Sequence, residues 1–173
     1  MNNIILIGFM GSGKTTFGKW LAGGWNIGFC DTDELIETKE GRTINDIFAS
    51  EGEEYFRTLE TEMIRALIEE RADRTAESVV ISVGGGLPVR PINRELMHKL
   101  GICVYLRTSK EELVRRLQSD TTRPLLAGGK LEEKIESLMA ARKDIYESVA
   151  DVILDTDSMS FEAMADIVKS KLI

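Results

Sequence analysis

A glycine-rich segment near the start of the chain carries the clearest chemistry. Residues 8–15 read Gly-Phe-Met-Gly-Ser-Gly-Lys-Thr and match the pattern G-x-x-x-x-G-K-[ST] at every fixed position. The apolar run Ile4–Ile7 precedes the motif and a helical pattern follows it, which is the context that this motif requires. Glycines let backbone N–H groups curl around a phosphate, and the N-terminus of the next helix adds further donors. The segment therefore predicts binding of a nucleoside triphosphate.

Two side chains of this segment are expected to act on the nucleotide. Lys14 is expected to reach the β- and γ-phosphates and to pack against nothing in the core, and the hydroxyl of Thr15 can ligate Mg²⁺. The motif does not identify the acceptor of the phosphoryl group. Sequence signatures of GTPases (N-K-x-D and D-x-x-G) and of ABC-type ATPases (L-S-G-G-Q) do not occur in the chain. These two classes are therefore excluded.

Two carboxylates follow the second apolar run. Asp31-Thr32-Asp33 comes directly after Ile27–Cys30. Ligands bind at the carboxyl ends of parallel strands, so both carboxylates are expected to face the phosphates. One could hold metal-bound water, and the other could bind or deprotonate an acceptor hydroxyl. Either could instead cap the next helix. Asp155 also ends an apolar run, but that run is the last in the chain and a structural role is expected.

Three glycines, Gly84–Gly86, end the third apolar run, Val79–Val83. Consecutive glycines lose much conformational entropy on folding. Three of them favour the close approach of a ligand, or a nest of backbone donors, over a plain turn.

Arginines in the helical segments are candidates for binding anions. Arg57 and Glu60 share one helical face, where a surface ion pair of little energetic value is the alternative. Arg142 lies inside an amphipathic helix, where it could be a flanking residue with a buried stem. His98, the only histidine, is expected at the surface. We therefore expect no histidine-based chemistry.

A segment of about residues 118–130 combines polar residues, two glycines and a short apolar centre. Arg116 and Arg123 bracket its beginning. This composition is typical of a mobile lid, because few side chains anchor it. Arginine on such a lid can neutralise charge on a transferring phosphoryl group and exclude water.

Elements that position these residues follow from hydrophobic patterning. Continuous apolar runs without alternation indicate strands buried on both faces, as in a parallel sheet. Helical patterns separate them, which predicts a three-layer α/β fold. The region of about residues 33–68 has no strand pattern and is predicted to be helical, beside the sheet. The five expected strands are Ile4–Ile7, Ile27–Cys30, Val79–Val83, Ile102–Leu106 and Val152–Leu154.

Length and composition bound the remaining possibilities. The 173 residues, 43% hydrophobic and 29% charged, predict a single globular domain over residues 1–173. A net charge of −7 argues against nucleic acid as the main partner. The first residues are too short and too polar for a signal peptide or membrane span, so we expect a cytoplasmic protein without a membrane partner. Cys30 and Cys103 lie in apolar runs and are expected to be buried, inert thiols.

The chain resembles the shikimate kinase family in motifs that occur in order over essentially its whole length. The resemblance implies ATP-dependent phosphorylation of the 3-hydroxyl of shikimate, on the route to chorismate and the aromatic amino acids, with Mg²⁺. It also implies a monomer and a five-stranded parallel sheet of order 2-3-1-4-5. The motifs are residues 8–16, Asp31-Thr32-Asp33, Phe56-Arg57, Gly84–Gly86, Arg123-Pro124-Leu125-Leu126 and Arg142 with Tyr146.

The same resemblance implies roles for individual residues. Lys14, Asp33 and Arg123 would be catalytic, and Thr15 with Asp31 would hold Mg²⁺. ATP would be bound by Gly11, Ser12, Gly13, Lys14, Thr15, Thr16, Arg116 and Arg123. Shikimate would be bound by Asp33, Arg57, Glu60, Gly84, Gly85, Gly86 and Arg142, with Ile44, Phe48 and Phe56 on its apolar side.

Two other functions fit part of the pattern. A kinase of another polyhydroxy carboxylate, such as gluconate, would use the same arginines, but the Asp31–Asp33 motif and the triple glycine favour shikimate. A non-catalytic nucleotide switch would predict a damaged substrate site, whereas every expected polar residue is present. The chain departs from the family's pattern at Trp25, where an aliphatic residue is usual, and in the loop of residues 156–160, which lacks a basic residue.

Overall fold

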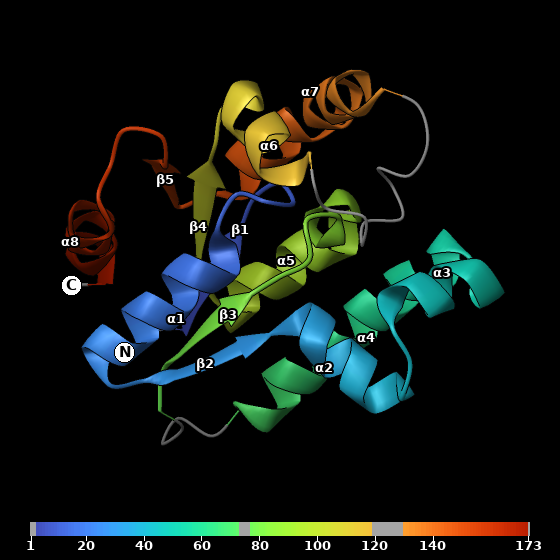
Figure 1. Ribbon diagram of the computed structural model, residues 1–173. Helices are drawn as coiled ribbons and strands as arrows, with labels where there is room; N and C mark the ends of the chain where they lie inside the picture. Colours follow the sequence, from blue (N-terminus) through green and yellow to red (C-terminus); the bar gives the residue numbers. More distant parts are fainter. Residues whose placement is uncertain (1–2, 73–76, 119–129, 173) are drawn as a thin grey trace.

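Five parallel strands form the centre of the computed structural model, which describes residues 3–72, 77–118 and 130–172 (Figure 1). Their order across the sheet is β2-β3-β1-β4-β5, so the predicted order is confirmed. Ile5 of the central strand pairs with Ile81 on one side and Cys103 on the other. The strands are β1 (Asn3–Ile7), β2 (Gly28–Asp31), β3 (Val79–Ser82), β4 (Gly101–Arg107) and β5 (Val152–Asp155).

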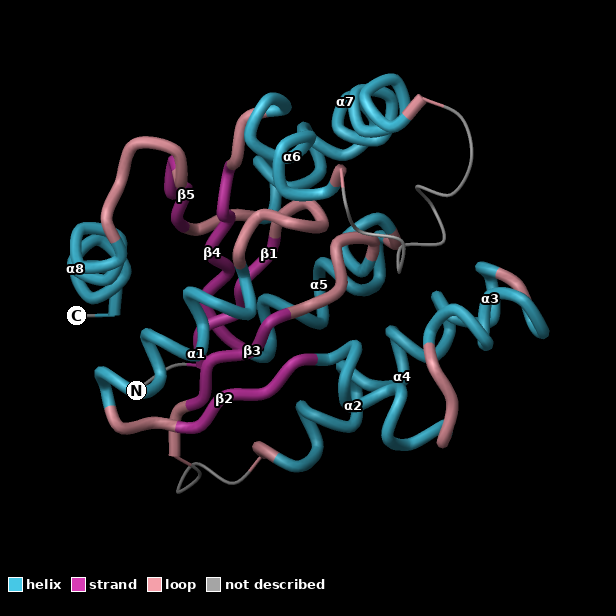
Figure 2. Tube along the Cα trace, viewed as in Figure 1, coloured by secondary structure: helices cyan, strands magenta, loops and turns pink. Residues whose placement is uncertain are grey.

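Helices cover both faces of this sheet, which confirms the three-layer architecture (Figures 1 and 2). The short 3₁₀ turn η1 (Leu87–Val89) follows the triple glycine. The helices are α1 (Lys14–Trp25), α2 (Thr32–Glu40), α3 (Ile44–Glu51), α4 (Glu53–Glu70), α5 (Pro91–Leu100), α6 (Lys110–Leu117), α7 (Leu131–Val149) and α8 (Phe161–Leu172).

Alternate residues of the central strand supply two separate cores. Ile4 and Leu6 pack with α1 and α8 on one face, whereas Ile5 and Ile7 pack with α4, α5, α6 and α7 on the other. All four side chains are fully buried. Burial on both faces explains why the run is continuously apolar instead of alternating.

The region predicted to be helical beside the sheet forms α2, α3 and α4, next to the edge strand β2 (Figure 2). Local signals define these helices. Asp31 caps α2, and Gly41 ends it in a left-handed conformation with φ of 66°. Thr43 and Asp46 form a capping box at the start of α3. These caps define the ends of the helices that connect β2 to α4.

Two cysteines differ in their environments. Cys103 on β4 is buried as predicted, but Cys30 is only partly buried. The prediction for Cys30 is wrong because β2 is an edge strand and its side chains keep some exposure. Burial nevertheless raises the pKa of the Cys30 thiol to about 11 and that of Cys103 to about 12.

The expected lid lies almost wholly outside the described residues, and Arg123 with it. Only its ends, Gln118 and Lys130, are described. In the parts of the chain that the structure describes, no helix combines the length and apolar character needed to cross a membrane.

Candidate active site

The glycine-rich segment forms a loop from the end of β1 to the first residue of α1. Gly11 has φ of 79° and Gly13 has φ of 93°, a conformation that L side chains rarely adopt. Gly13 is the N-cap of α1, so the unpaired N–H groups of the first helical turn face the curve of the loop. Glycines at these positions therefore create the anion-binding N-terminus that the motif predicts.

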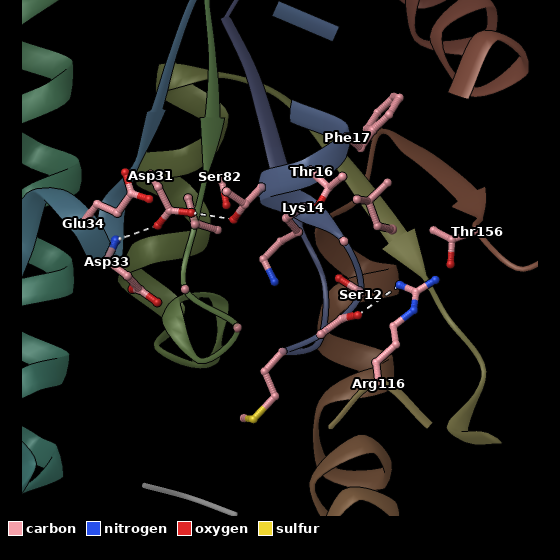
Figure 3. A pocket seen from close by; sticks show the side chains of 18 of the residues that line it. Ser12, Lys14, Thr16, Phe17, Asp31, Asp33, Glu34, Ser82, Arg116 and Thr156 are labelled. Atoms are coloured by element: carbon pink, nitrogen blue, oxygen red, sulfur yellow. Dashed lines mark hydrogen bonds between the residues drawn. The ribbon is translucent and has the colours of Figure 1, made fainter. Parts of the chain in front are cut away.

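Lys14 lies inside this curve, with Asp31 and Asp33 toward one side and Arg116 and Thr156 toward the other (Figure 3). Its Nζ donates to the carbonyl oxygens of Gly8 at 2.9 Å and of Phe9 at 3.0 Å. The side chain is buried, with 9% exposed. Lys14 is in neither hydrophobic core, as expected, and its ammonium group also braces the loop.

Asp31 accepts two hydrogen bonds, one from the phosphate loop and one from the start of α2. Its Oδ2 accepts a hydrogen bond from Thr15 Oγ1 at 2.9 Å, and its Oδ1 accepts from the backbone N–H of Asp33 at 3.0 Å. The residue thus caps α2 and also meets the hydroxyl at the phosphate loop. Hydroxyl and carboxylate oxygens are the ligands that Mg²⁺ prefers, so this pair fits a magnesium ion.

A cavity of about 570 Å³ opens over the phosphate loop. Arg116 lies at its rim, donating through Nη1 to the carbonyl of Gly11 at 3.0 Å and through Nε to Glu112 at 2.6 Å. Sequence reasoning did not assign several other lining residues to the site, among them Thr156, Phe161 and Met164, which come from the last loop and helix of the chain. The lining includes Gly11, Ser12, Gly13, Lys14, Thr15, Thr16, Asp31, Asp33, Gly84, Gly85 and Arg116.

A second cavity of about 370 Å³ adjoins the first. The structure brings together here all the residues expected to bind the acceptor. Its lining includes Asp33, Ile44, Phe48, Phe56, Arg57, Glu60, Gly84, Gly85, Gly86 and Arg142. Met10, Asp33, Glu34, Gly84 and Gly85 line both cavities. An acceptor in the second cavity therefore sits beside the phosphate loop.

Arg57 is held by two carboxylates on its own helix. Its Nη1 donates to Glu60 at 2.7 Å, and its Nε and Nη2 donate to Glu53 at 3.2 and 2.8 Å. Arg57 is 7% exposed and Glu60 is fully buried, so the alternative of a surface ion pair is wrong. Glu53 was missed by sequence reasoning, because an i,i+4 acid–base pair is common on any exposed helix.

Glu60 has an unusual electrostatic environment. Burial, and then the nearby charge of Asp33, raise its pKa to about 7, against the opposing effect of Arg57. Its Oε1 has no hydrogen-bond partner among the described residues. This oxygen is therefore left to interact with whatever occupies the second cavity.

Arg142 reaches the same cavity from α7. It is 6% exposed, and its guanidinium lies over the ring of Phe9 with 6.0 Å from Cζ to the centroid. Its Nη1 lacks a hydrogen-bond partner within residues 3–72, 77–118 and 130–172. The alternative of a buried stem with a solvated head is wrong, because the head is buried too. A buried cation with an unused donor is a strong site for an anionic group.

The triple glycine allows the site's polar groups to crowd together. A Cβ on Gly84 would lie 2.6 Å from Asp33 Oδ1 and 2.9 Å from Glu60 Oε1. A Cβ on Gly85 would lie 3.2 Å from the carbonyl oxygen of Gly8, and one on Gly86 would overlap the Arg57 guanidinium. At each of the three positions a side chain would crowd a group that lines one of the two cavities or the phosphate loop.

Comparisons with known proteins agree with this geometry. The model of the family "Shikimate kinase" matches residues 10–172. A shikimate kinase of Geobacter metallireducens is 43% identical over 162 residues, which is 94% of this chain and 87% of that protein. One from a Sulfurihydrogenibium species is 41% identical, over 99% of this chain and 98% of that protein. The chain belongs to the shikimate kinase family. The sequence resemblance is thereby confirmed.

Solved structures show the same relationship. Shikimate kinase from Acinetobacter baumannii in complex with shikimate has a TM-score of 0.89 and 36% identity, covering 99% of this chain and 93% of that one. A gluconokinase from Sinorhizobium meliloti shares the fold, with a TM-score of 0.57 at 19% identity over 99% of this chain and 94% of that one. At this low identity the likeness concerns the fold alone.

Two other residues considered in the sequence lie outside both cavities. Asp155 accepts from Arg107 Nε at 2.6 Å and from Nη2 at 2.8 Å, an exposed pair between β4 and β5. His98 is exposed at the end of α5. Both positions agree with the structural roles expected for them.

Proposed function

We propose that this chain transfers the γ-phosphoryl group of ATP to the 3-hydroxyl of shikimate, giving shikimate 3-phosphate and ADP. The reaction would serve the biosynthesis of chorismate and the aromatic amino acids. One observation carries the proposal. An arginine-lined cavity shares Asp33, Gly84 and Gly85 with the cavity of the phosphate loop, so acceptor and donor can lie side by side.

The charges suit an acceptor with one carboxylate. Arg57 is already compensated by Glu53 and by the partly protonated Glu60, whereas Arg142 keeps an unused donor. Arg142 therefore supplies the main charge for the substrate carboxylate, and Arg57 adds directed hydrogen bonds. The aromatic rings of Phe48 and Phe56, 5.1 Å apart, form the apolar side against the carbon ring.

Asp33 lies where the two cavities join, which suits a ligand of the reacting hydroxyl. As a carboxylate it accepts hydrogen bonds from ring hydroxyls, and it can take the proton as the new P–O bond forms. Lys14 and the N-terminus of α1 stabilise the phosphate charge that shifts during transfer. Arg116, and Arg123 on the segment outside the described residues, would add positive charge from the rim.

Thr15 and Asp31 would hold Mg²⁺ through their side-chain oxygens. When bound, the ion neutralises charge on the β- and γ-phosphates. The same residues keep α1 and the start of α2 in register, so the metal ligands and Asp33 are positioned together.

The same proposal describes the protein as a single domain over residues 1–173 that acts as a cytoplasmic monomer. Neither nucleic acid nor membrane is among its proposed partners. Support comes from the net charge of −7, which disfavours binding to phosphate backbones.

The test is Asp33→Asn with a panel of acceptors. Wild type is expected to turn over shikimate and not gluconate. The variant should lose at least about a hundredfold in kcat, because an amide can neither take the proton nor accept from both hydroxyls. Its KM for ATP should stay within about threefold of wild type.

A matched control is Asp46→Asn, which changes an exposed carboxylate of the capping box at α3. It should leave kcat and both KM values near wild type. Loss of nucleotide affinity in Asp33→Asn with shikimate affinity preserved would show that Asp33 belongs to the donor side. Turnover of gluconate at the rate of shikimate would contradict the proposed acceptor.

A further inference from the structure

Tyr146 lies beneath the acceptor cavity and reaches it through one hydrogen bond. The side chain sits on α7, is 1% exposed and is among the largest fully buried ones. Its hydroxyl donates to the carbonyl oxygen of Gly85 at 2.5 Å. The two residues are 61 positions apart in the chain. The bond therefore joins α7 to the centre of the triple glycine.

Tyr146 holds the carbonyl of Gly85, whereas other groups hold the neighbouring residues of the turn. The N–H of Leu87 donates to the carbonyl of Gly84 at 3.0 Å, and Asn93 Nδ2 donates to the carbonyl of Leu87 at 2.8 Å. These bonds fix the turn to η1 and α5. Gly85, which lines both cavities, takes its carbonyl contact from the phenol.

Tyr146 also interacts with the arginine that faces the acceptor. Arg142 lies one helical turn earlier on α7, close enough for its positive charge to act on the phenol. Burial raises the pKa of Tyr146 to about 12, and Arg142 opposes the shift. The hydroxyl therefore stays protonated, and remains a donor to Gly85, across the physiological range.

The packing around the ring leaves little freedom. The Tyr146 ring lies 5.1 Å from that of Tyr105 at an angle of 40°. The side chain is 1% exposed, so its surroundings set the position of the ring and with it that of the hydroxyl.

We propose that Tyr146 is a positioning residue for the acceptor, whose single hydroxyl sets the position of the Gly85 carbonyl. Through Gly85 it fixes the backbone that meets the acceptor's ring. The inference rests on the proposed function for the identity of that acceptor. The hydroxyl does not touch the reacting atoms itself.

The test removes only this hydroxyl. Tyr146→Phe keeps the ring and its packing, so the fold should survive with a melting temperature a few degrees lower. KM for shikimate should rise about three- to tenfold, the equivalent of one net hydrogen bond. KM for ATP and kcat should stay within about twofold, because the phosphate loop keeps all its own contacts.

Tyr105→Phe is the matched control. Tyr105 is buried in the same aromatic pair, but the charges that act on its phenol are those of Glu147, Arg107 and Asp155, and it does not line the acceptor cavity. This variant should show wild-type KM values. An equal rise in both KM values, or the same rise in both tyrosine variants, would indicate a general packing defect and overturn the proposal.

A readout without turnover separates this inference from the proposed function. Amide hydrogen exchange at residues 84–87 should be faster in Tyr146→Phe than in wild type and unchanged in Tyr105→Phe. Unchanged exchange in Tyr146→Phe would overturn the positioning role whatever the acceptor is. A wild-type enzyme that fails to phosphorylate shikimate would instead overturn the proposed function. The exchange result would still test whether Tyr146 holds the glycine turn.

Discussion

At the scale of single residues, Glu60 shows how burial converts an ordinary carboxylate into a tunable group. It is fully buried between the guanidinium of Arg57 and the carboxylate of Asp33. Removal from water disfavours its charged form more than Arg57 favours it, and its pKa rises to about 7. The acceptor cavity therefore changes its net charge close to neutral pH.

The raised pKa predicts a pH-dependent penalty on stability. Between the unfolded value near 4.5 and the folded value of about 7, the native state binds more protons than the unfolded state. The free energy of unfolding must then fall as pH rises through this window, by about 1 kcal/mol per pH unit. Glu60→Gln removes this proton uptake. Urea unfolding at pH 5 to 8 should show wild type losing stability relative to the variant.

The exposed Glu62 on the same helix provides the control. The difference between wild type and Glu62→Gln should stay constant over the same pH range. A constant difference for Glu60→Gln as well would mean that Glu60 is fully ionised in the folded protein at pH 5.

At the scale of elements, the turn between β3 and η1 decides how closely the two cavities approach. Gly84 faces Asp33 and Glu60, Gly85 faces the phosphate loop, and Gly86 faces Arg57. The glycines are therefore a consequence of packing between elements that are distant in sequence.

Gly86→Ala tests this packing with little backbone strain. Gly86 has φ of −90° and ψ of −13°, which alanine adopts readily. Its new Cβ would overlap the Arg57 guanidinium, so Arg57 must shift away from its carboxylates. Overpacking of this kind is worth about 1–3 kcal/mol, and KM for shikimate should rise about tenfold. KM for ATP should change by less than about twofold, since Arg57 lies outside the nucleotide cavity.

Gly24→Ala in α1 is the control, because a Cβ there meets nothing within 4 Å. It should leave both KM values unchanged and raise the free energy of unfolding by about 0.5–1 kcal/mol, as alanine loses less entropy in a helix. A wild-type KM for shikimate in Gly86→Ala would show that Arg57 does not contribute to acceptor binding.

At the scale of the whole molecule, the two cores share one sheet. Every strand residue between Ile4 and Ile7 contributes to one core or the other. Unpairing the sheet for one core would therefore expose the other. Ile36 of α2, Ile47 of α3 and Ile64 of α4 belong to the same core as Ile5 and Ile7.

Such sharing predicts one cooperative unfolding transition. Trp20 and Trp25 lie on α1, on the α1–α8 face, so their fluorescence follows that core. Far-ultraviolet circular dichroism follows all helices, including α2 to α4. The two urea curves should coincide. A second transition in circular dichroism without a fluorescence change would show that the α2–α4 region unfolds as a separate unit.

The sequence by itself predicted the parallel sheet and the phosphate loop, because each depends on residues that are neighbours in the chain. Continuous apolar runs reveal strands buried on two faces, and the G-x-x-x-x-G-K-[ST] motif specifies its own backbone shape. Residues of the acceptor site were identified through the family's motifs, and the structure places Asp33, Arg57 and Arg142 around one cavity.

Only the tertiary structure decided how these residues are held. The double pairing of Arg57 with Glu53 and Glu60, the bracing of the loop by Lys14, and the bond from Tyr146 to Gly85 are absent from any local pattern. The physical reason is that burial and electrostatic environment depend on residues far apart in the chain. An isolated Arg-x-x-Glu looks like a solvated ion pair until α7 and the triple glycine remove the water around it.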